Sequence, residues 1–320
     1  MPDSNKRSCC SVSRNNSTNS SDHDSFPTKP SSKEDIIKDM IYIPGGEFLM
    51  GTDYKKRIFE DGEGPIRNIK INPFYIDPTS VSNQSFQTFV EETKYITEAE
   101  KFGWSFIFHS LVSEKIKSKV RNIPSQAPWW YVVEGAYWKR PEGPGSTIVS
   151  RMDHPVVHVS WNDAIAYCKW AGKRLLTETE WEFAARGGLE QKIYPWGNEL
   201  TPNGEFQCNI WQGTFPTNNT KEDGYLGTAP ISSYKPNGYG LYNMVGNVWE
   251  WCSDWFSRSL HNRGGRTNPK GSATGQAKVI RGGSYLCHYS YCNRYRVAAR
   301  SSNTPDSSTG NMGFRCALNT

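Results

Sequence analysis

Hydrophobic and polar positions divide this chain of 320 residues into a polar start and a longer segment of short periodic runs. Residues 1–36 are rich in Ser, Asn, Asp and Lys and contain few large apolar side chains. Such a stretch cannot bury enough apolar surface to offset the entropy that ordering removes. The pattern therefore predicts a disordered N-terminal tail over residues 1–36 and one folded domain over residues 37–320.

The first apolar runs of the folded segment predict strands. In residues 39–53, apolar side chains flank a Gly-Gly pair, which is typical of a hairpin. Residues 66–77 alternate between apolar and polar side chains, which predicts a further strand. From residue 189 onward, Gly, Pro and Asn recur so often that only short strands are expected.

Helical spacing appears at two places. Residues 80–95 place Phe86 and Phe89 on one face, and Ser82 stands in the N-cap position. Residues 160–188 predict two consecutive helices, each opened by a capping box that joins a hydroxyl side chain to a carboxylate three positions later. The two capping boxes are Ser160 with Asp163 and Thr177 with Glu180.

Composition modifies this picture by favouring an irregular architecture. Only 36% of the residues are hydrophobic and the mean hydropathy is −0.68, yet the chain has 12 Trp, 16 Tyr and 28 Gly. Large amphipathic rings packed between glycine turns favour loops over long helices. We therefore expect an α+β fold with little regular secondary structure.

The distribution of charge argues against two classes of partner. The formal net charge is +5, and acidic and basic residues are interspersed along the chain, so the sequence shows no nucleic-acid footprint. No apolar run reaches the roughly 18 residues that a membrane span requires, so membrane insertion is not expected.

Candidate chemistry gathers in residues 282–296, where four residues separate Cys287 from Cys292. The pair could form a short disulfide, remain two inert thiols, or supply half of a zinc site. It could also hold Cu(I), because soft thiolates select monovalent copper. The nearby His288, Arg294 and Arg296 would favour the thiolate form. The spacing alone leaves these alternatives open.

Two further segments are rich in oxygen ligands. Residues 209–225 and 243–251 mix Asn, Asp and Glu side chains with glycine turns that can direct backbone carbonyls inward. Calcium prefers such oxygen ligands, although loops of this composition are more often plain turns.

Longer motifs resemble one known family. They are GGEFLMGTD, HPVVHVSWNDAIAYCKWAGKRLLTETEWEFAARGG, YPWGN, NGYGLYNMVGNVWEWCSDW and RGGSYLCHYSYCNRYRVAARSSNTPDSSTGNMGFRCA. Together they resemble the formylglycine-generating enzymes over residues 40 to 318, and the last motif is typical of the active eukaryotic type. The resemblance implies a single C-type-lectin-like catalytic domain over residues 37–320.

The resemblance also implies an activity. Members of the family use O2 to oxidise the cysteine of a Cys-x-Pro-x-Arg motif in unfolded or nascent sulfatase polypeptides to Cα-formylglycine. Their two active-site cysteines correspond to Cys287 and Cys292, which would hold Cu(I) together with the substrate thiolate. Ser284 and Trp249 would line the oxygen pocket. The residues expected in or beside the peptide groove are Asn311, Arg296, Tyr291, Trp129 and Trp130, although simple packing explains the tryptophan pair equally well.

Structural features follow from the same resemblance. It implies a disulfide between Cys168 and Cys316, and residence in the endoplasmic reticulum lumen or secretion, although residues 1–26 show no apolar signal core. Cys9 and Cys10 correspond to an N-terminal pair that exchanges disulfides with partners. Two calcium sites are implied, at Asn209, Ile210, Asp223 and Tyr225, and at Asn243, Gly246, Val248 and Glu250.

An alternative of another class remains. The chain could be a non-catalytic paralogue that binds sulfatases and regulates the active enzyme. Such paralogues lack the reactive cysteine pair, whereas this chain keeps both Cys287 and Cys292. The sequence therefore favours the enzyme.

Overall fold

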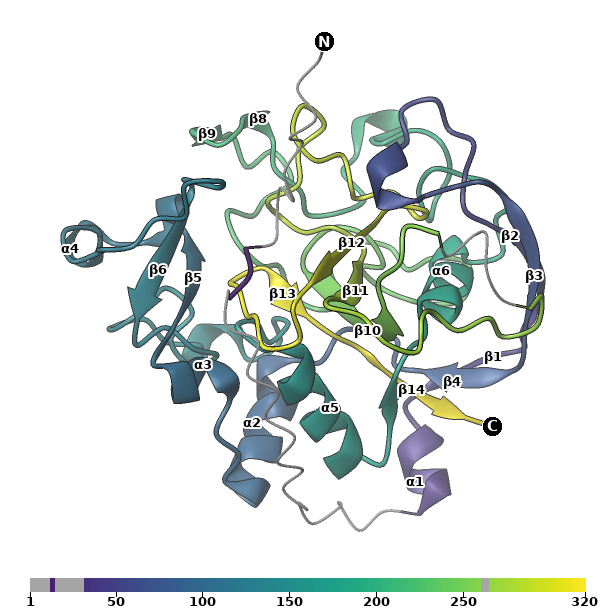
Figure 1. Ribbon diagram of the computed structural model, residues 1–320, viewed down its shortest axis with the longest axis horizontal. Coiled ribbons are helices and arrows are strands. Elements are labelled where there is room, and N and C mark those ends of the chain that lie inside the picture. Colours follow the sequence, from purple (N-terminus) through teal and green to yellow (C-terminus); the bar gives the residue numbers. More distant parts are fainter. Residues whose placement is uncertain (1–11, 15–31, 260–264) are drawn as a thin grey trace.

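A computed structural model describes residues 12–14, 32–259 and 265–320 (Figure 1). Its helices are short, since the longest in the described ranges has 11 residues. They are α1 (Lys33–Ile37), α2 (Asn83–Thr93), α3 (Glu98–Phe102), α4 (Glu114–Lys117), α5 (Trp161–Trp170) and α6 (Glu178–Arg186). None of the helices in these ranges is long and apolar enough to cross a membrane.

The strands form two four-stranded sheets and three two-stranded ones. The first sheet joins β1 (Ile41–Ile43), β4 (Phe74–Ile76), β14 (Cys316–Asn319) and β7 (Arg174–Leu175), in that order. The second joins β12 (Arg300–Asn303), β11 (Lys278–Arg281), β10 (Trp249–Trp255) and β13 (Met312–Gly313). The small sheets pair β2 (Gly46–Met50) with β3 (Arg67–Ile71), β5 (Trp104–Phe108) with β6 (Trp130–Glu134), and β8 (Gly213–Thr214) with β9 (Asn218–Asn219).

The second sheet occupies the middle of the molecule (Figure 1). Its strands β10 and β13 are parallel, and the other pairs in both large sheets are antiparallel. Strands β11 and β12 carry residues 282–299 between them, so the segment with both candidate cysteines starts and ends on this central sheet. The expectation of an α+β fold with little regular structure is confirmed.

Two local predictions were wrong or incomplete. The predicted hairpin at residues 39–53 does not form, because β1 pairs with β4 and β2 pairs with β3. The predicted strand at 66–77 is two strands, β3 and β4, that belong to different sheets. Pro73 lacks the N–H that a continuous ladder needs, and the chain changes sheets at this point.

The predicted tail boundary also needs adjustment. Helix α1 crosses it, because Ser32 and Asp35 form a capping box just before residue 36. Residues 12–14, inside the predicted tail, contact the folded domain. For the rest of residues 1–31, the tail stays a prediction.

Helix-capping chemistry was predicted correctly. Ser82 accepts a hydrogen bond from the Ser85 amide at the start of α2. Both predicted capping boxes are formed, at the first turns of α5 and α6. These local signals succeed because each joins residues only three positions apart.

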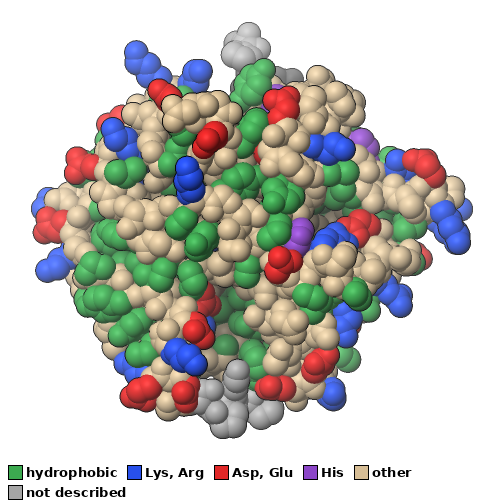
Figure 2. Space-filling view, turned by 180° about the vertical axis from the view of Figure 1, so that it is seen from behind, with side chains coloured by type: hydrophobic (Ala, Val, Ile, Leu, Met, Phe, Trp, Pro, Cys, Tyr) green, Lys and Arg blue, Asp and Glu red, His purple; other side chains and the backbone are tan. Residues whose placement is uncertain are grey.

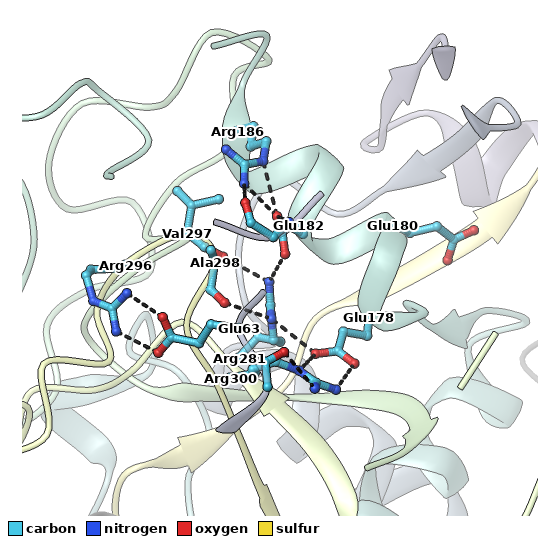
Figure 3. Close-up of polar contacts among 12 residues, drawn as sticks. Glu63, Glu178, Glu180, Glu182, Arg186, Arg281, Arg296, Val297, Ala298 and Arg300 are labelled. Carbon is cyan, nitrogen blue, oxygen red and sulfur yellow. Dashed lines mark hydrogen bonds and ion pairs between the residues drawn. The ribbon is translucent and has the colours of Figure 1, made fainter. Parts of the chain in front are cut away.

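A buried ionic network holds α6 against the central sheet (Figure 3). Arg281 is fully buried, and its guanidinium lies 3.1 Å from Glu178 and 2.6 Å from Glu182. Arg300 contacts the same Glu178 carboxylate at 2.6 and 2.7 Å, and Arg186 pairs with Glu182 at 2.6 Å. Arg281 and Arg300 end β11 and begin β12, so the network fixes both ends of the segment that carries the cysteines.

This network predicts a loss of stability in acid. Burial alone would raise the pKa of Glu182, but Arg186 and Arg281 outweigh it and hold the pKa at about 2, against an ordinary 4.5. A carboxyl whose pKa is lowered by folding stabilises the native state above its unfolded pKa and ceases to do so as it protonates. We expect the free energy of unfolding, measured with urea, to fall between pH 4.5 and about 2. A free energy that stays constant over this range would contradict the role assigned to Glu182.

The charged surface agrees with the interspersed sequence pattern. On the face in Figure 2, blue and red side chains alternate around the molecule, with hydrophobic side chains scattered between them. That arrangement gives this face no extended field of one sign.

Candidate active site in the cysteine loop

The cysteine loop, residues 282–296, follows β11 and begins with two glycines in the left-handed region. Gly282 has φ 92° and Gly283 has φ 74°. A Cβ on Gly283 would lie 2.9 Å from the Arg294 carbonyl oxygen, and one on Gly282 would lie 2.9 Å from that of Met244. These positions therefore require glycine, because the loop folds back on itself without room for a side chain.

Both candidate cysteines are closed off from solvent. Cys287 is 0% exposed and Cys292 is 1% exposed, and the structure gives both as thiols. The Ser284 amide donates to Cys287 Sγ at 3.4 Å, and the Cys292 amide donates to the His288 carbonyl at 3.0 Å. Tyr295 of the same loop is 2% exposed, and burial is the largest cause of its raised pKa, followed by Tyr194, Cys208, Cys292 and Cys287.

The arginines of the loop form ion pairs with carboxylates. Arg294 pairs with Asp61 at 2.6 Å. Arg296 is only 2% exposed and holds Glu63 in a bidentate pair at 2.6 and 2.7 Å (Figure 3). Their charges are therefore matched by carboxylates, and the place of Arg296 in or beside a peptide groove stays a prediction.

Ser284, Asn311 and Trp249 come together behind the cysteines. Asn311 Nδ2 donates to Ser284 Oγ at 2.9 Å, and the Trp249 amide donates to the Asn311 carbonyl at 2.9 Å. Thr309 Oγ1 orients Asn311 by donating to its Oδ1 at 2.6 Å. All four residues are 0% exposed, and Trp249 Nε1 has no hydrogen-bond partner in the described ranges. Asn311 thus orients Ser284 from a buried position. Thr309, which orients Asn311, belongs to the same hydrogen-bonded group and was missed by sequence reasoning.

An aromatic cluster borders the cysteine loop on another side. Trp129 meets Tyr291 edge to face with ring centroids 4.9 Å apart, and Phe215 stacks on Tyr291 at 4.5 Å. All three are partly exposed, so they can contact a peptide. Trp130 is different: it is 0% exposed in β6 and packs against Phe108, which agrees with the packing alternative for this residue. Sequence reasoning missed Phe215, because it lies in an Asn- and Thr-rich turn.

The first oxygen-rich segment folds around Asp223. Its Oδ2 accepts from the Ile210 amide at 2.9 Å and its Oδ1 accepts from the Tyr225 amide at 3.0 Å. Gln212 Nε2 donates to Asp223 Oδ2 and to the Ile210 carbonyl. Asn209 Oδ1 is buried and has no partner in the described ranges. Burial raises the pKa of Asp223.

The second oxygen-rich segment is assembled less completely. Asn243 Oδ1 is buried without a partner in the described part of the chain. Glu250, however, receives hydrogen bonds from Arg315 on both oxygens and from Trp181 Nε1 at 2.8 Å. The Glu250 carboxylate is therefore already paired with protein side chains and not available as a ligand for a metal ion in this structure. The carbonyls of Gly246 and Val248 belong to the same turn.

Both oxygen-rich segments brace the cysteine loop through backbone hydrogen bonds. The Trp211 amide donates to the Cys287 carbonyl at 3.1 Å. The Tyr285 amide donates to the Asn247 carbonyl at 2.9 Å, and the Gly246 amide donates to the Gly282 carbonyl at the same distance. Order in these segments is thus transmitted directly to the loop.

Cys168 and Cys316, the predicted disulfide pair, lie outside the cysteine loop. Cys168 on α5 and Cys316 on β14 are buried, with their sulfurs 3.5 Å apart as thiols. Cys9 and Cys10 lie outside the described residues. The described ranges contain no group of three or more His, Cys, Asp or Glu residues that could hold a metal ion.

Known proteins resemble this chain over most of its length. The family described as Sulfatase-modifying factor enzyme 1-like domain matches residues 25–320. A formylglycine-generating enzyme of Thermomonospora curvata is 60% identical over 289 residues, which cover 89% of this chain and 95% of that protein. One from Bos taurus is 58% identical over 279 residues, covering 87% and 74%.

Two further comparisons concern activity and fold. A Bos taurus protein named Inactive C-alpha-formylglycine-generating enzyme 2 is 48% identical over 281 residues, covering 87% of each chain. The solved structure of PvdO from Pseudomonas aeruginosa matches with a TM-score of 0.64 at 22% identity, covering 88% of this chain and 94% of that one. The similarity to PvdO concerns the fold alone, and that fold agrees with the predicted one. The family match and the identities of 58% and 60% show that this chain belongs to the formylglycine-generating enzyme family.

Proposed function

We propose that this protein oxidises the cysteine of a Cys-x-Pro-x-Arg motif in unfolded sulfatase polypeptides to Cα-formylglycine, with O2 as oxidant. The observation that carries the proposal is the pair of buried thiols, Cys287 and Cys292, on one glycine-anchored loop. Relatives that are 60% and 58% identical carry the name of this activity. The two thiols stand on one loop that glycine turns and backbone hydrogen bonds hold in place.

The residues of the loop fit Cu(I). Two soft sulfur donors lie in an apolar, water-excluding environment, and the Ser284 amide donates to Cys287 Sγ. Cys287 and Cys292 would hold the ion, which would supply the redox chemistry between O2 and the substrate thiol when bound. Conversion of thiol to aldehyde releases sulfide and two electrons, and an external thiol reductant would supply the other two that reduce O2 to water.

The protein's own residues would bind and orient the reactants. Ser284 Oγ, fixed by Asn311, and Trp249 Nε1, which has no partner in the described ranges, offer buried polar groups next to the cysteines. Trp129 and Tyr291 offer partly exposed ring faces for the peptide beside the loop. Burial of the thiols keeps bulk water from the reacting sulfur.

Copper binding gives a test that is independent of turnover. We expect the reduced protein to take up about one Cu(I) per chain, because one loop supplies both soft ligands. Competition with a chromogenic Cu(I) chelator measures the stoichiometry and affinity. The Cys287→Ser variant should lose this site, and equal binding by wild type and variant, or a preference for zinc, would contradict the assignment.

We also propose that the Asp223 segment binds Ca2+. Asp223, the unpartnered Asn209 Oδ1 and the carbonyls of Ile210 and Tyr225 supply the hard oxygen ligands that calcium prefers. The Asn243 turn, with the carbonyls of Gly246 and Val248, is a weaker candidate because Arg315 occupies Glu250.

Calcium at Asp223 is expected to stabilise the protein. A ligand that binds only the native state at 100 times its Kd adds about 2.7 kcal/mol, so Tm should rise by several degrees. Scanning calorimetry with calcium and with a chelator measures the shift. Asp223→Asn should abolish it, whereas Asp153→Asn, on another surface turn, should leave it unchanged. An undiminished shift in Asp223→Asn would place calcium elsewhere.

The compartment and the disulfide are parts of the same proposal. The adjacent thiols of Cys168 and Cys316 would form the structural bridge under oxidising conditions, as in the endoplasmic reticulum lumen. Cys9 and Cys10 would serve as sites of disulfide exchange. The alternative of a non-catalytic paralogue is less well supported, because the loop retains both thiols in a buried, braced geometry.

A further inference from the structure

Residues 12–14 of the N-terminal segment lie against the folded domain beside β5, as the short dark purple piece in Figure 1 shows. Val12 is 7% exposed and Arg14 is 4% exposed. Asn303 clamps this tripeptide: its Nδ2 donates to the Val12 carbonyl at 3.0 Å, and its Oδ1 accepts from Ser13 Oγ at 2.7 Å. This tripeptide of the predicted tail is therefore bound to the folded domain by hydrogen bonds.

Arg14 enters a pocket built for a guanidinium. Its Nη1 donates to the Asp306 carbonyl at 2.5 Å, its Nη2 donates to the Trp104 carbonyl at 2.6 Å, and its amide donates to Ser307 Oγ at 2.7 Å. The guanidinium carbon lies 4.5 Å from the ring centroids of both Phe102 and Trp104. Stacked rings and carbonyl acceptors match the flat, multiply donating shape of arginine.

The pocket is also acidic. Asp306 and Glu98 are each 8% exposed, and Asp306 Oδ2 and Glu98 Oε2 have no hydrogen-bond partner in the described ranges. Together with Asp163, these carboxylates attract the Arg14 charge, while burial lowers its pKa to about 10. Thr304 and Asn162 each donate to one oxygen of these carboxylates, and the second oxygen of each is buried without a hydrogen bond, so a cation such as Arg14 offsets part of the cost of their burial.

Val12 places the tripeptide next to the cysteine loop. It packs in one cluster with Leu286, Tyr285 and Trp211. Leu286 precedes Cys287, and the Trp211 amide binds the Cys287 carbonyl. The tripeptide therefore runs from the edge of the candidate active site to the acidic pocket.

The sequence around the tripeptide has the spacing of the proposed substrate motif. Residues 10–14 read Cys-Ser-Val-Ser-Arg, which matches Cys-x-Pro-x-Arg except that valine replaces proline. Proline fixes its φ angle, whereas valine does not. A tail with valine at this position therefore loses more conformational entropy on binding, which weakens its binding and keeps it displaceable.

We propose that residues 12–14 act as an internal pseudosubstrate, and that Val12, Ser13 and Arg14 occupy the site that receives the x-Arg end of an incoming Cys-x-Pro-x-Arg peptide. The inference rests on the proposed function for the identity of that peptide. The tail competes with substrate for the free enzyme and leaves once substrate binds, so it raises KM and leaves kcat unchanged.

Arg14→Ala in the full chain tests the competition. A tethered ligand acts at an effective concentration on the order of 1 mM, so a tail with a Kd of about 0.1 mM raises the apparent KM roughly tenfold. We expect Arg14→Ala to lower KM for a Cys-x-Pro-x-Arg peptide by about this factor with kcat unchanged. Arg7→Ala removes the same charge from the same tail outside the motif and should behave as wild type. Unchanged KM in Arg14→Ala, or an equal change in Arg7→Ala, would overturn the proposal.

A second measurement does not depend on turnover. Trypsin should cleave the wild-type chain after Arg7 much faster than after the buried Arg14. An excess of a Ser-Ala-Pro-Ser-Arg peptide, whose serine replaces the reacting cysteine, should accelerate cleavage after Arg14 and leave that after Arg7 unchanged. Rapid cleavage after Arg14 without the peptide, or no acceleration with it, would contradict a displaceable tail. If the peptide displaces the tail but the cysteine peptide is never converted, the shared binding site is supported and the proposed function is rejected.

Discussion

Serine at position 287 or 292 is expected to abolish conversion of a Cys-x-Pro-x-Arg peptide. Each substitution removes one of the two soft ligands while keeping the size of the side chain. Loss of a group that merely supports a metal ligand costs about 10–100-fold, so loss of a ligand should exceed 100-fold. Initial rates of aldehyde formation, with copper and reductant supplied, measure the effect.

Cys252→Ser is the matched control for these variants. Cys252 is also 0% exposed, but it lies in β10, outside the cysteine loop. Burying the serine hydroxyl costs about 1–3 kcal/mol at either kind of position, so all three variants should lose similar stability. Cys252→Ser should nevertheless keep most of its activity. Substantial turnover by Cys287→Ser or Cys292→Ser, or an equal loss in the control, would refute the assignment of the thiol pair.

Alanine at position 178 is expected to produce the largest loss of stability. Glu178 is the carboxylate that Arg281 and Arg300 share, and all three side chains are at most 1% exposed. Removing it leaves two buried guanidinium groups without that partner, which costs about 3–5 kcal/mol. Thermal unfolding should then begin roughly 10 °C lower. Activity should fall as well, because these arginines fix both ends of the segment that contains the cysteine loop.

Glu114→Ala provides the comparison. Glu114 also forms an ion pair, with Lys117 at 2.7 Å, but its side chain is 87% exposed. Exposed pairs contribute about 0–1 kcal/mol, so Tm should change by no more than about 2 °C. Glu178→Gln keeps the shape of the side chain but removes its charge, so its loss of Tm should lie between those of Glu178→Ala and Glu114→Ala. Similar losses in Glu178→Ala and Glu114→Ala would show that the buried network does not hold the fold.

The sequence was most informative where structure depends on near neighbours. The capping boxes of α5 and α6 were predicted residue by residue, since each joins positions three apart. The hairpin at residues 39–53 failed because strand pairing depends on distant partners, and β4 lies about 30 residues from β1 in the chain. A glycine pair signals a turn, but it does not say which strands that turn will bring together.

The candidate site shows the same division. Cys287 and Cys292 stand in one motif and were identified by resemblance, but the residues that surround them come from distant segments. Phe215 and Thr309 carried no recognisable spacing, and the pairing of Arg296 with Glu63 joins positions 233 residues apart. Interactions of that range depend on the finished fold, which local periodicity does not encode.

The most direct test of the account is mass spectrometry of a Cys-x-Pro-x-Arg peptide after incubation with the protein, Cu(I), a thiol reductant and O2. The account predicts that the peptide loses its thiol sulfur and gains an aldehyde that reacts with a hydrazide. Conversion should cease when O2 or copper is withheld and when Cys287 is replaced by serine. An unchanged peptide under the complete conditions, with a folded and copper-loaded protein, would contradict the central claim.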